Sequence, residues 1–245
     1  MKKTEVMKQL KAMGTAQNRK VYARHGAGKE MYGVSYANLG KLRKQIKVDH
    51  DLACDLWATG NVDARALAAM VADPQAFRAS DLDAWLRDLE YHGLVDALAS
   101  VAAASPHGPR KADKWRKARN EYAARAGWVV LGNLALSDPD LPDHHFAEAL
   151  KEIEAGVHEA KNRAREGMHH ALIQIGCRSK GLRRKALAAA KRIGKVVIDH
   201  GETGCKTPDA GAYIEKTWAH AESKGFPSPA AQEQARNRRS IACAR

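Results

Sequence analysis

Histidine, tyrosine and aspartate stand at helical spacing in the segment LEYHGLVDALA. His92 and Asp96 are four residues apart and share one helix face, with Tyr91 on the adjoining flank. A carboxylate beside aromatic rings suits a cationic ligand. Because apolar Ala97 and Leu98 follow Asp96, we expect its carboxylate near a partly buried groove. A surface aspartate paired with a neighbouring arginine explains the same spacing equally well.

A single arginine interrupts the apolar segment EYAARAGWVVLGNLA. Arg125 has Tyr122 and Trp128 three residues to either side. Because a guanidinium group keeps its proton inside a protein, Arg125 must reach a partner or the mouth of a groove. Asp96 is one plausible partner, and a phosphate held by two hydrogen bonds is the other.

Basic residues concentrate in the later part of the chain. Between Lys161 and Lys195, eleven lysines and arginines stand against one acid, Glu166, and a shorter basic window runs from Arg110 to Arg125. Such a surface would displace counterions from phosphates, which makes affinity fall steeply with salt. A solvated face, an acidic protein or a membrane surface are the alternatives. The residues that we expect to contact DNA from the longer window are Arg163, Arg165, Arg183, Arg184 and Lys185.

Four possible metal ligands stand close together in DHGETGCKTPD. They are Asp199, His200, Glu202 and Cys205. Zinc usually recruits spaced pairs of ligands, so neither a metal nor another cofactor is predicted. A glycine-rich turn that leads into a helix explains the segment better, with Thr207 as N-cap and Pro208 as first helical residue.

Helical patterns must position these residues, because strand signals are scarce. The segments YANLGKLRKQIK and DLACDLWATG place leucines at three- and four-residue spacing. Six Ala-rich segments follow with the same character, and alanine is the strongest helix former. Ten or more helices with short connections predict an all-α solenoid of stacked antiparallel pairs, and a plain helical bundle is the alternative.

Turn residues divide the helical segments. The longest break, SPHGPRKADK, could be a domain boundary, but similar helical patterning resumes directly after it. We therefore predict one domain over residues 1–224. The polar, basic segment 225–245 is predicted to be a frayed tail.

Composition excludes several classes of protein. The chain has 245 residues, with 41 Lys and Arg against 28 Asp and Glu, for a net charge of +13. This balance favours a polyanionic partner. No apolar run approaches the roughly 18 residues of a membrane span, and the N-terminus has no secretory pattern. We expect a monomeric cytoplasmic protein whose four cysteines are reduced.

Several segments together resemble the DNA alkylation repair, or AlkD-like, family. They are the His92–Asp96 position, EYAARAGWVVL, NRAREGMHHALIQIG and, most specifically, AKRIGKVVIDHGETGCKTPDAGAYIEK. The resemblance covers about residues 30–220. It implies a fold of HEAT-like repeats and a DNA glycosylase that removes cationic N3- and N7-alkylated purines from double-stranded DNA without flipping the base into a pocket.

The resemblance also implies residue roles. Asp96 would be the catalytic carboxylate that stabilises an oxocarbenium-like sugar and orients water, and Arg125 would hold the neighbouring phosphate. Where the family's enzymes have two cleft tryptophans, this chain has His92, beside Tyr91, and the positions around Met168 and His169. Trp128 is one tryptophan that could substitute. Protonated histidine repels a cation and methionine has no flat π face.

Three functions follow as hypotheses. The first is a glycosylase that binds double-stranded DNA in a basic cleft. The second is a non-catalytic scaffold that binds DNA or recognises damage. The third is a HEAT-like module that binds an acidic protein.

Overall fold

The chain is helical throughout the part that the structure describes. The computed structural model describes residues 1–242, and within them every regular element is a helix, with no strand. The predicted all-α class is therefore confirmed, and the number of helices agrees with the ten or more expected. Across the same residues, no helix combines the length and apolar character that a bilayer crossing requires. Cys54, Cys177 and Cys205 are free thiols, and Cys243 lies outside the described residues.

Contacts between residues gather in two compact units. Unit 1 contains Met1–His107 and the short segment His200–Cys205, and unit 2 contains Gly108–Asp199 and the chain from Lys206 onward. The first division falls inside the SPHGPRKADK break. The single domain over residues 1–224 stays a prediction.

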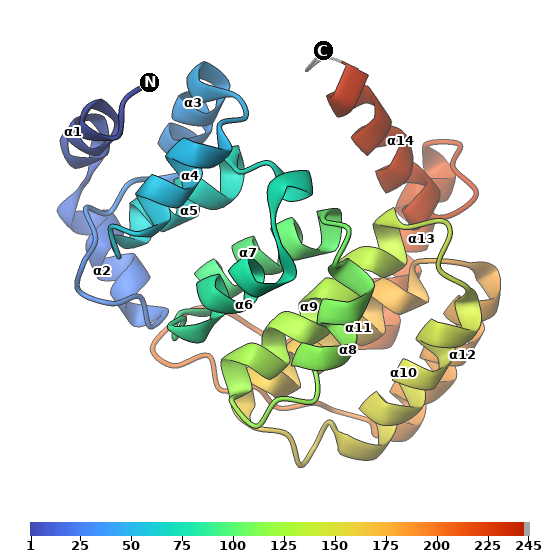
Figure 1. The fold of residues 1–245 in the computed structure, drawn as a ribbon. Coiled ribbons are helices and arrows are strands. Elements are labelled where there is room, and N and C mark those ends of the chain that lie inside the picture. Colours follow the sequence, from blue (N-terminus) through green and yellow to red (C-terminus); the bar gives the residue numbers. More distant parts are fainter. Residues whose placement is uncertain (243–245) are drawn as a thin grey trace. The chain divides into compact units, whose positions relative to one another are not determined.

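Unit 1 is built from seven α-helices and a 3-10 turn (Figure 1). They are α1 (Lys3–Met13), α2 (Ala16–Arg24), α3 (Tyr36–Ile46), α4 (His50–Trp57), α5 (Val62–Val71), η1 (Pro74–Ala76), α6 (Ala79–Arg87) and α7 (His92–Ala104). The side chains of Ser35, Asp49 and Asn61 cap the helices that follow them. The predicted apolar spacing is borne out, since Leu39 and Leu42 of α3 are buried.

A buried carboxylate organises the loop before α3. Asp63 is 1% exposed and accepts hydrogen bonds from the backbone N–H groups of Tyr32, Gly33 and Val34 at 2.6, 3.0 and 2.8 Å. Tyr22 donates to the carbonyl of Val34 at 2.8 Å. A buried carboxylate is tolerated where hydrogen bonds replace its hydration, so Asp63 serves the fold of unit 1.

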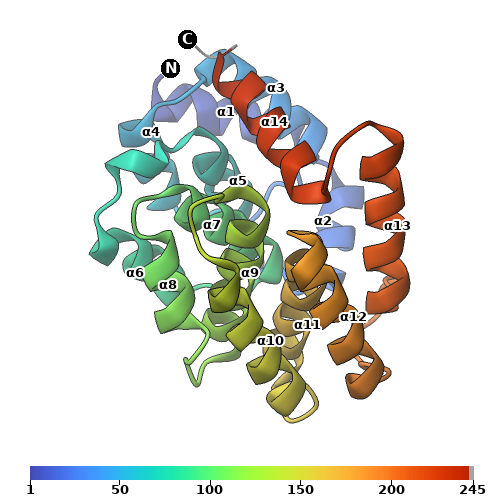
Figure 2. The ribbon, with the colours of Figure 1, turned by 90° about the vertical axis from the view of Figure 1, so that its right-hand side faces the viewer.

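Unit 2 contains the remaining helices. They are α8 (Gly108–Trp115), α9 (Glu121–Ser137), α10 (Asp143–Gly156), α11 (Asn162–Gly176), α12 (Lys180–Ile193), α13 (Ala210–Ser223) and α14 (Pro229–Ala242). Helix α11 packs between α9 and α13, and α12 lies beside α10, α11 and α13 (Figure 2). Helix α8 occupies part of the segment predicted as a break, so the break is shorter than expected.

Small residues allow the helices of unit 2 to approach closely. A methyl group on Gly127 of α9 would lie 2.0 Å from the backbone nitrogen of Arg116, just after α8. On Gly167 of α11 it would lie 3.1 Å from the Cα atom of Arg125. One on Gly132 of α9 would lie 3.4 Å from the Cα atom of Ala171. Residue numbers rise together in the last two pairs, from 125 with 167 to 132 with 171, which shows that α9 and α11 run parallel.

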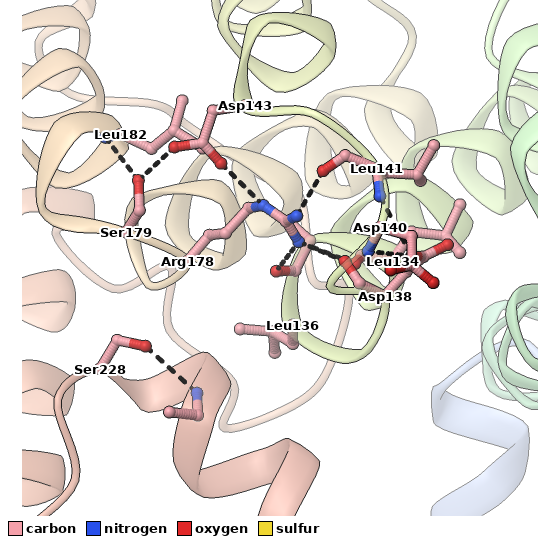
Figure 3. A network of polar contacts seen from close by, with 12 residues as sticks. Leu134, Leu136, Asp138, Asp140, Leu141, Asp143, Arg178, Ser179, Leu182 and Ser228 are labelled. Atoms are coloured by element: carbon pink, nitrogen blue, oxygen red, sulfur yellow. Dashed lines mark hydrogen bonds and ion pairs between the residues drawn. The ribbon is translucent and has the colours of Figure 1, made fainter.

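Arg178 ties together the ends of three helices (Figure 3). Its side chain is 8% exposed and pairs with Asp143, at the start of α10, at 3.0 Å. It also donates to the carbonyls of Ala135 at 3.0 Å, Asp138 at 2.6 Å and Leu141. Carbonyls at the end of a helix have no partner within it, so Arg178, two residues beyond the end of α11, supplies one for α9.

An extended segment connects α12 to α13. Its side chains alternate with a two-residue period, since Val196 and Ile198 are buried and Val197 is exposed. The segment stays extended without pairing as a strand. Asp209 caps α13 by accepting from the N–H of Ala212 at 2.7 Å. The prediction of Thr207 as cap was wrong, because two more residues remain extended before the helix.

Helix α14 differs from the predicted frayed tail. It packs against α9 and α13, and Ala230 donates to the carbonyl of Cys177 at 3.2 Å. Gln234 reaches the carbonyl of Leu136 at 3.3 Å. Pro229 stands at the first helical position, which proline favours, and the arginines and glutamines that follow are good helix formers. Residues 243–245 of the predicted tail lie outside the described residues.

Candidate nucleic-acid interface

Helix α12 carries a row of exposed cations. Lys180, Arg184 and Lys191 lie on one face because they are four and seven residues apart, and Lys185 lies on its flank. All four side chains are exposed, and among the described residues none makes an ion pair. Helix α12 contains no acid. We call these four residues the α12 row.

Other predicted DNA contacts are engaged within the protein. Arg163 bonds Glu166 at 2.9 Å, and Arg183 pairs with Glu215. Arg165 donates to the carbonyls of Val197, His158 and Ala160 at 3.0, 3.0 and 2.9 Å, and so holds the extended segment against α11. Arg184 and Lys185 remain exposed. The basic window thus serves the fold as well as the surface.

Two members of the α12 row were not singled out in the sequence. Lys180 and Lys191 lie in the basic window, but only their spacing from Arg184 distinguishes them from their neighbours. Arg192 also lies in the basic window, but it pairs with Glu154 at 2.8 Å and is therefore not part of the α12 row. Spacing could have found the face, whereas the ion pairs could not be read from the sequence.

Arg125 is buried in an ion pair. Its side chain is 1% exposed, and its Nη1 donates to Oε2 of Glu166 at 2.6 Å. Burial by itself raises the pKa of Glu166, but the guanidinium groups of Arg125 and Arg163 bring that pKa below its ordinary value. The pair is therefore ionised at neutral pH. Sequence reasoning had considered Asp96 or a phosphate as partner of Arg125, and Glu166 was missed.

Asp96 lies in the first half of α7 and is half-buried. Burial raises the pKa of Tyr36, and the negative charge of Asp96 adds to this effect. Burial, with Tyr36, Tyr22 and Asp96 nearby, likewise raises the pKa of Tyr91. A small cleft in unit 1 is lined by Tyr22, Tyr36 and Tyr91 together with Asp63. The charge of Asp96 therefore acts on Tyr36 and Tyr91, although Asp96 itself does not line this cleft.

His92 is the first residue of α7, and Tyr91 precedes the helix. The ring centroids of His92 and Tyr91 are 5.2 Å apart, and those of His92 and His25 are 5.7 Å apart. His92 therefore belongs to an aromatic cluster of unit 1.

Trp128 and Met168 come together in unit 2, where they line an open hollow of about 260 Å³. Their residues are 4% and 6% exposed. Arg116 lies over the Trp128 ring, with its guanidinium carbon 5.6 Å from the ring centroid. We call this feature the α9–α11 hollow, because both helices begin at it. A base could reach only the edges of Trp128 and Met168 there.

His169 is a buried structural histidine. It is 3% exposed, and its Nε2 lies 2.9 Å from the carbonyl of Pro208. Burial lowers the pKa of His169 below its ordinary value, despite that hydrogen bond. Its neutral ring connects α11 to the segment before α13.

Comparison with known proteins agrees with this architecture. The family model described as DNA alkylation repair enzyme matches residues 6–214. The chain belongs to the DNA alkylation repair enzyme family. The resemblance noted from its motifs is thereby confirmed.

Relatives of this family member are similar over most of their length. An uncharacterized protein of Listeria innocua is 28% identical over 216 residues, which cover 85% of this chain and 93% of that protein. An uncharacterized protein of Listeria monocytogenes is 27% identical over the same extent.

A solved structure shares the fold. It is described as a new family of proteins related to the HEAT-like repeat DNA glycosylases with affinity for branched DNA structures. The TM-score is 0.82 at 28% identity, with 90% of this chain and 95% of that chain covered. The predicted HEAT-like fold class is confirmed.

Proposed function

We propose that this protein binds DNA without excising bases, that it prefers branched DNA, and that the α12 row contacts the sugar-phosphate backbone. The observation that carries the proposal is the α12 row, exposed and without ion pairs among the described residues. Phosphate contacts dominate the affinity of most DNA-binding proteins. The preference for branched DNA is supported by what is said of the structural relative. Double-stranded DNA is the weaker ligand in this proposal.

Removing charge from the row tests the proposal. We expect K180Q/R184Q/K191Q to weaken binding to a four-way DNA junction by about tenfold to a hundredfold at physiological salt, because each lost phosphate contact lowers the salt slope by roughly one. Fluorescence anisotropy at several salt concentrations measures both the affinity for the junction and its dependence on salt. The wild type should bind the junction more tightly than a duplex of the same length.

The matched control removes the same charge elsewhere. Lys11, Lys41 and Lys44 are exposed lysines of α1 and α3. The variant K11Q/K41Q/K44Q should keep the wild-type salt dependence of binding and most of the affinity for the junction. Equal losses in the two triple variants would show that net charge alone acts, and the assignment to α12 would then fail.

Excision of cationic alkylated purines is the second candidate function. It is favoured by the half-buried carboxylate of Asp96, since such a group can stabilise a positively charged sugar. Against it stand His92, whose ring contacts those of His25 and Tyr91, and Met168, which is buried in unit 2. Neither supplies the exposed flat aromatic face that a cationic base requires.

An excision assay separates the two functions. We expect wild type and Asp96→Asn to release methylated purine from alkylated DNA at the same background rate. Chromatography of the released bases measures this rate. Release by the wild type that Asp96→Asn loses by about a hundredfold or more would establish the glycosylase instead, because one electrostatic group contributes on this order.

A further inference from the structure

The extended segment between α12 and α13 is bound to α11 along one edge of its backbone. We call residues 195–199 of this segment the strap. Asn162 donates to the carbonyl of Asp199 and accepts from its N–H group, both at 2.8 Å. Arg165 donates to the carbonyl of Val197 at 3.0 Å. Because the backbone groups of alternate residues in an extended chain point to the same edge, side chains of α11 cover the edge to which residues 197 and 199 point.

The opposite edge of the strap has no hydrogen-bond partner among the residues that the structure describes. It is formed by the N–H and carbonyl groups of Val196 and Ile198. The side chains of these two residues pack inward, which leaves the residues 5% and 8% exposed. Lys195 and Val197 on the outer face are exposed, so the strap lies at the surface. An extended segment at the surface with unpaired backbone groups is a template for pairing with another chain.

The strap has the sequence KVVID, which is complementary to itself. If two copies pair antiparallel about Val197, Lys195 of each copy lies opposite Asp199 of the other. Val196 of each copy then lies opposite Ile198 of the other, and these are the pairs that exchange both N–H···O bonds in an antiparallel ladder. The two outward Val197 side chains, each 63% exposed in the single chain, would meet at the centre. Opposite charges and apolar side chains directly across from each other stabilise paired strands.

We propose that two copies of this chain associate through the strap, which forms a two-stranded antiparallel sheet across a two-fold axis. The self-complementary charges favour a second copy over an unrelated peptide, because a two-fold interface uses the same patch on both subunits. Five residues from each chain bury far less than the roughly 1,200 Å² of standard interfaces, so we expect a dissociation constant on the order of 0.1 mM. The monomer expected from the sequence is then the form at low concentration. This inference does not rest on DNA binding.

Exchanging the charges of the strap tests the pairing. K195D places aspartates opposite each other at both ends of the paired strands and should raise the dissociation constant at least about fivefold. K195D/D199K restores opposite charges and should return the constant to within about threefold of wild type. Sedimentation equilibrium of the full chain up to about 1 mM measures the constants, and circular dichroism checks that each variant is folded. A wild-type protein that is monomeric throughout, or a folded K195D/D199K that associates no better than K195D, overturns the proposal.

Disulfide trapping tests the register without changing any charge. The Cα atoms of the central Val197 pair would be about 4.5 Å apart, which a disulfide can span. In the background C54S/C205S/C243S, which keeps only the buried Cys177, oxidised glutathione should link V197C into dimers at least about tenfold faster than V48C. Val48 is the matched control because it is 64% exposed. Equal rates for V197C and V48C would show random collision between molecules and would rule out the paired strap.

Discussion

Replacing Arg125 with alanine is expected to lower the free energy of unfolding by about 3 kcal/mol, because the change removes a buried partner of Glu166 and leaves Arg163 to neutralise its carboxylate. The Arg125 side chain is 1% exposed and that of Glu166 10% exposed, so water cannot replace the lost partner. Urea unfolding followed by circular dichroism measures the effect. DNA binding by this variant is informative only at temperatures where it remains folded.

A surface pair provides the control for Arg125. Lys151 and Glu148 lie 2.8 Å apart with side chains 73% and 63% exposed. Lys151→Ala should cost at most about 0.5 kcal/mol, because exposed pairs contribute little. Replacing both Arg125 and Glu166 with apolar residues of similar size should recover much of the stability. A loss below about 1 kcal/mol in Arg125→Ala would contradict the importance of the pair.

The contribution of the Arg125–Glu166 pair to stability should depend on pH in the acid range. The pKa of Glu166 is below its ordinary value in the folded protein, so the unfolded chain binds its proton first as the pH falls. The contribution of Glu166 is complete above its ordinary pKa of 4.5 and is lost as the pH falls through the lower, folded value. The difference in stability between wild type and Glu166→Gln should therefore shrink below about pH 4.5. A constant difference down to pH 3 would argue against ionisation of the pair.

Arg178→Ala is expected to cost about 3 kcal/mol or more. The change removes the donor for carbonyls at the end of α9 and leaves them buried without partners, each at a cost of about 1–3 kcal/mol. Thermal unfolding compares it with Arg192→Ala, whose guanidinium is 58% exposed in its pair with Glu154. Arg192→Ala should stay within about 1 kcal/mol of wild type. Similar losses of stability in the two variants would show that Arg178 contributes no more than an exposed ion pair.

Much of the helical architecture could be predicted from local patterns. The segment NRAREGMHHALIQIG has the same bounds as α11, since its apolar spacing and helix formers agree. Helix α8 was missed because Pro109 and a run of cations resemble a break, although proline is tolerated in the first helical turn. Lys111 and Trp115 of α8 are buried despite that polar composition.

The candidate site was less predictable, because its contacts join residues far apart in the chain. Arg125 and Glu166 are 41 residues apart, and no local pattern selects Glu166 over another acid. Asp96 is half-buried, as its apolar neighbours predicted, whereas its role in a site stays a prediction. Which arginines of the basic window remain available to DNA depended on glutamates from α10 and α13.

The short segment His200–Cys205 determines how this protein can be dissected. It belongs to unit 1, although the chain before and after it belongs to unit 2. A gene fragment that ends at His107 would encode unit 1 without these six residues, and the complementary fragment would carry them as a foreign insertion. To express unit 1 alone, residues 200–205 would have to be attached to it, and to express unit 2 alone they would have to be replaced by a linker. Co-expression of the two fragments would test whether they reassociate.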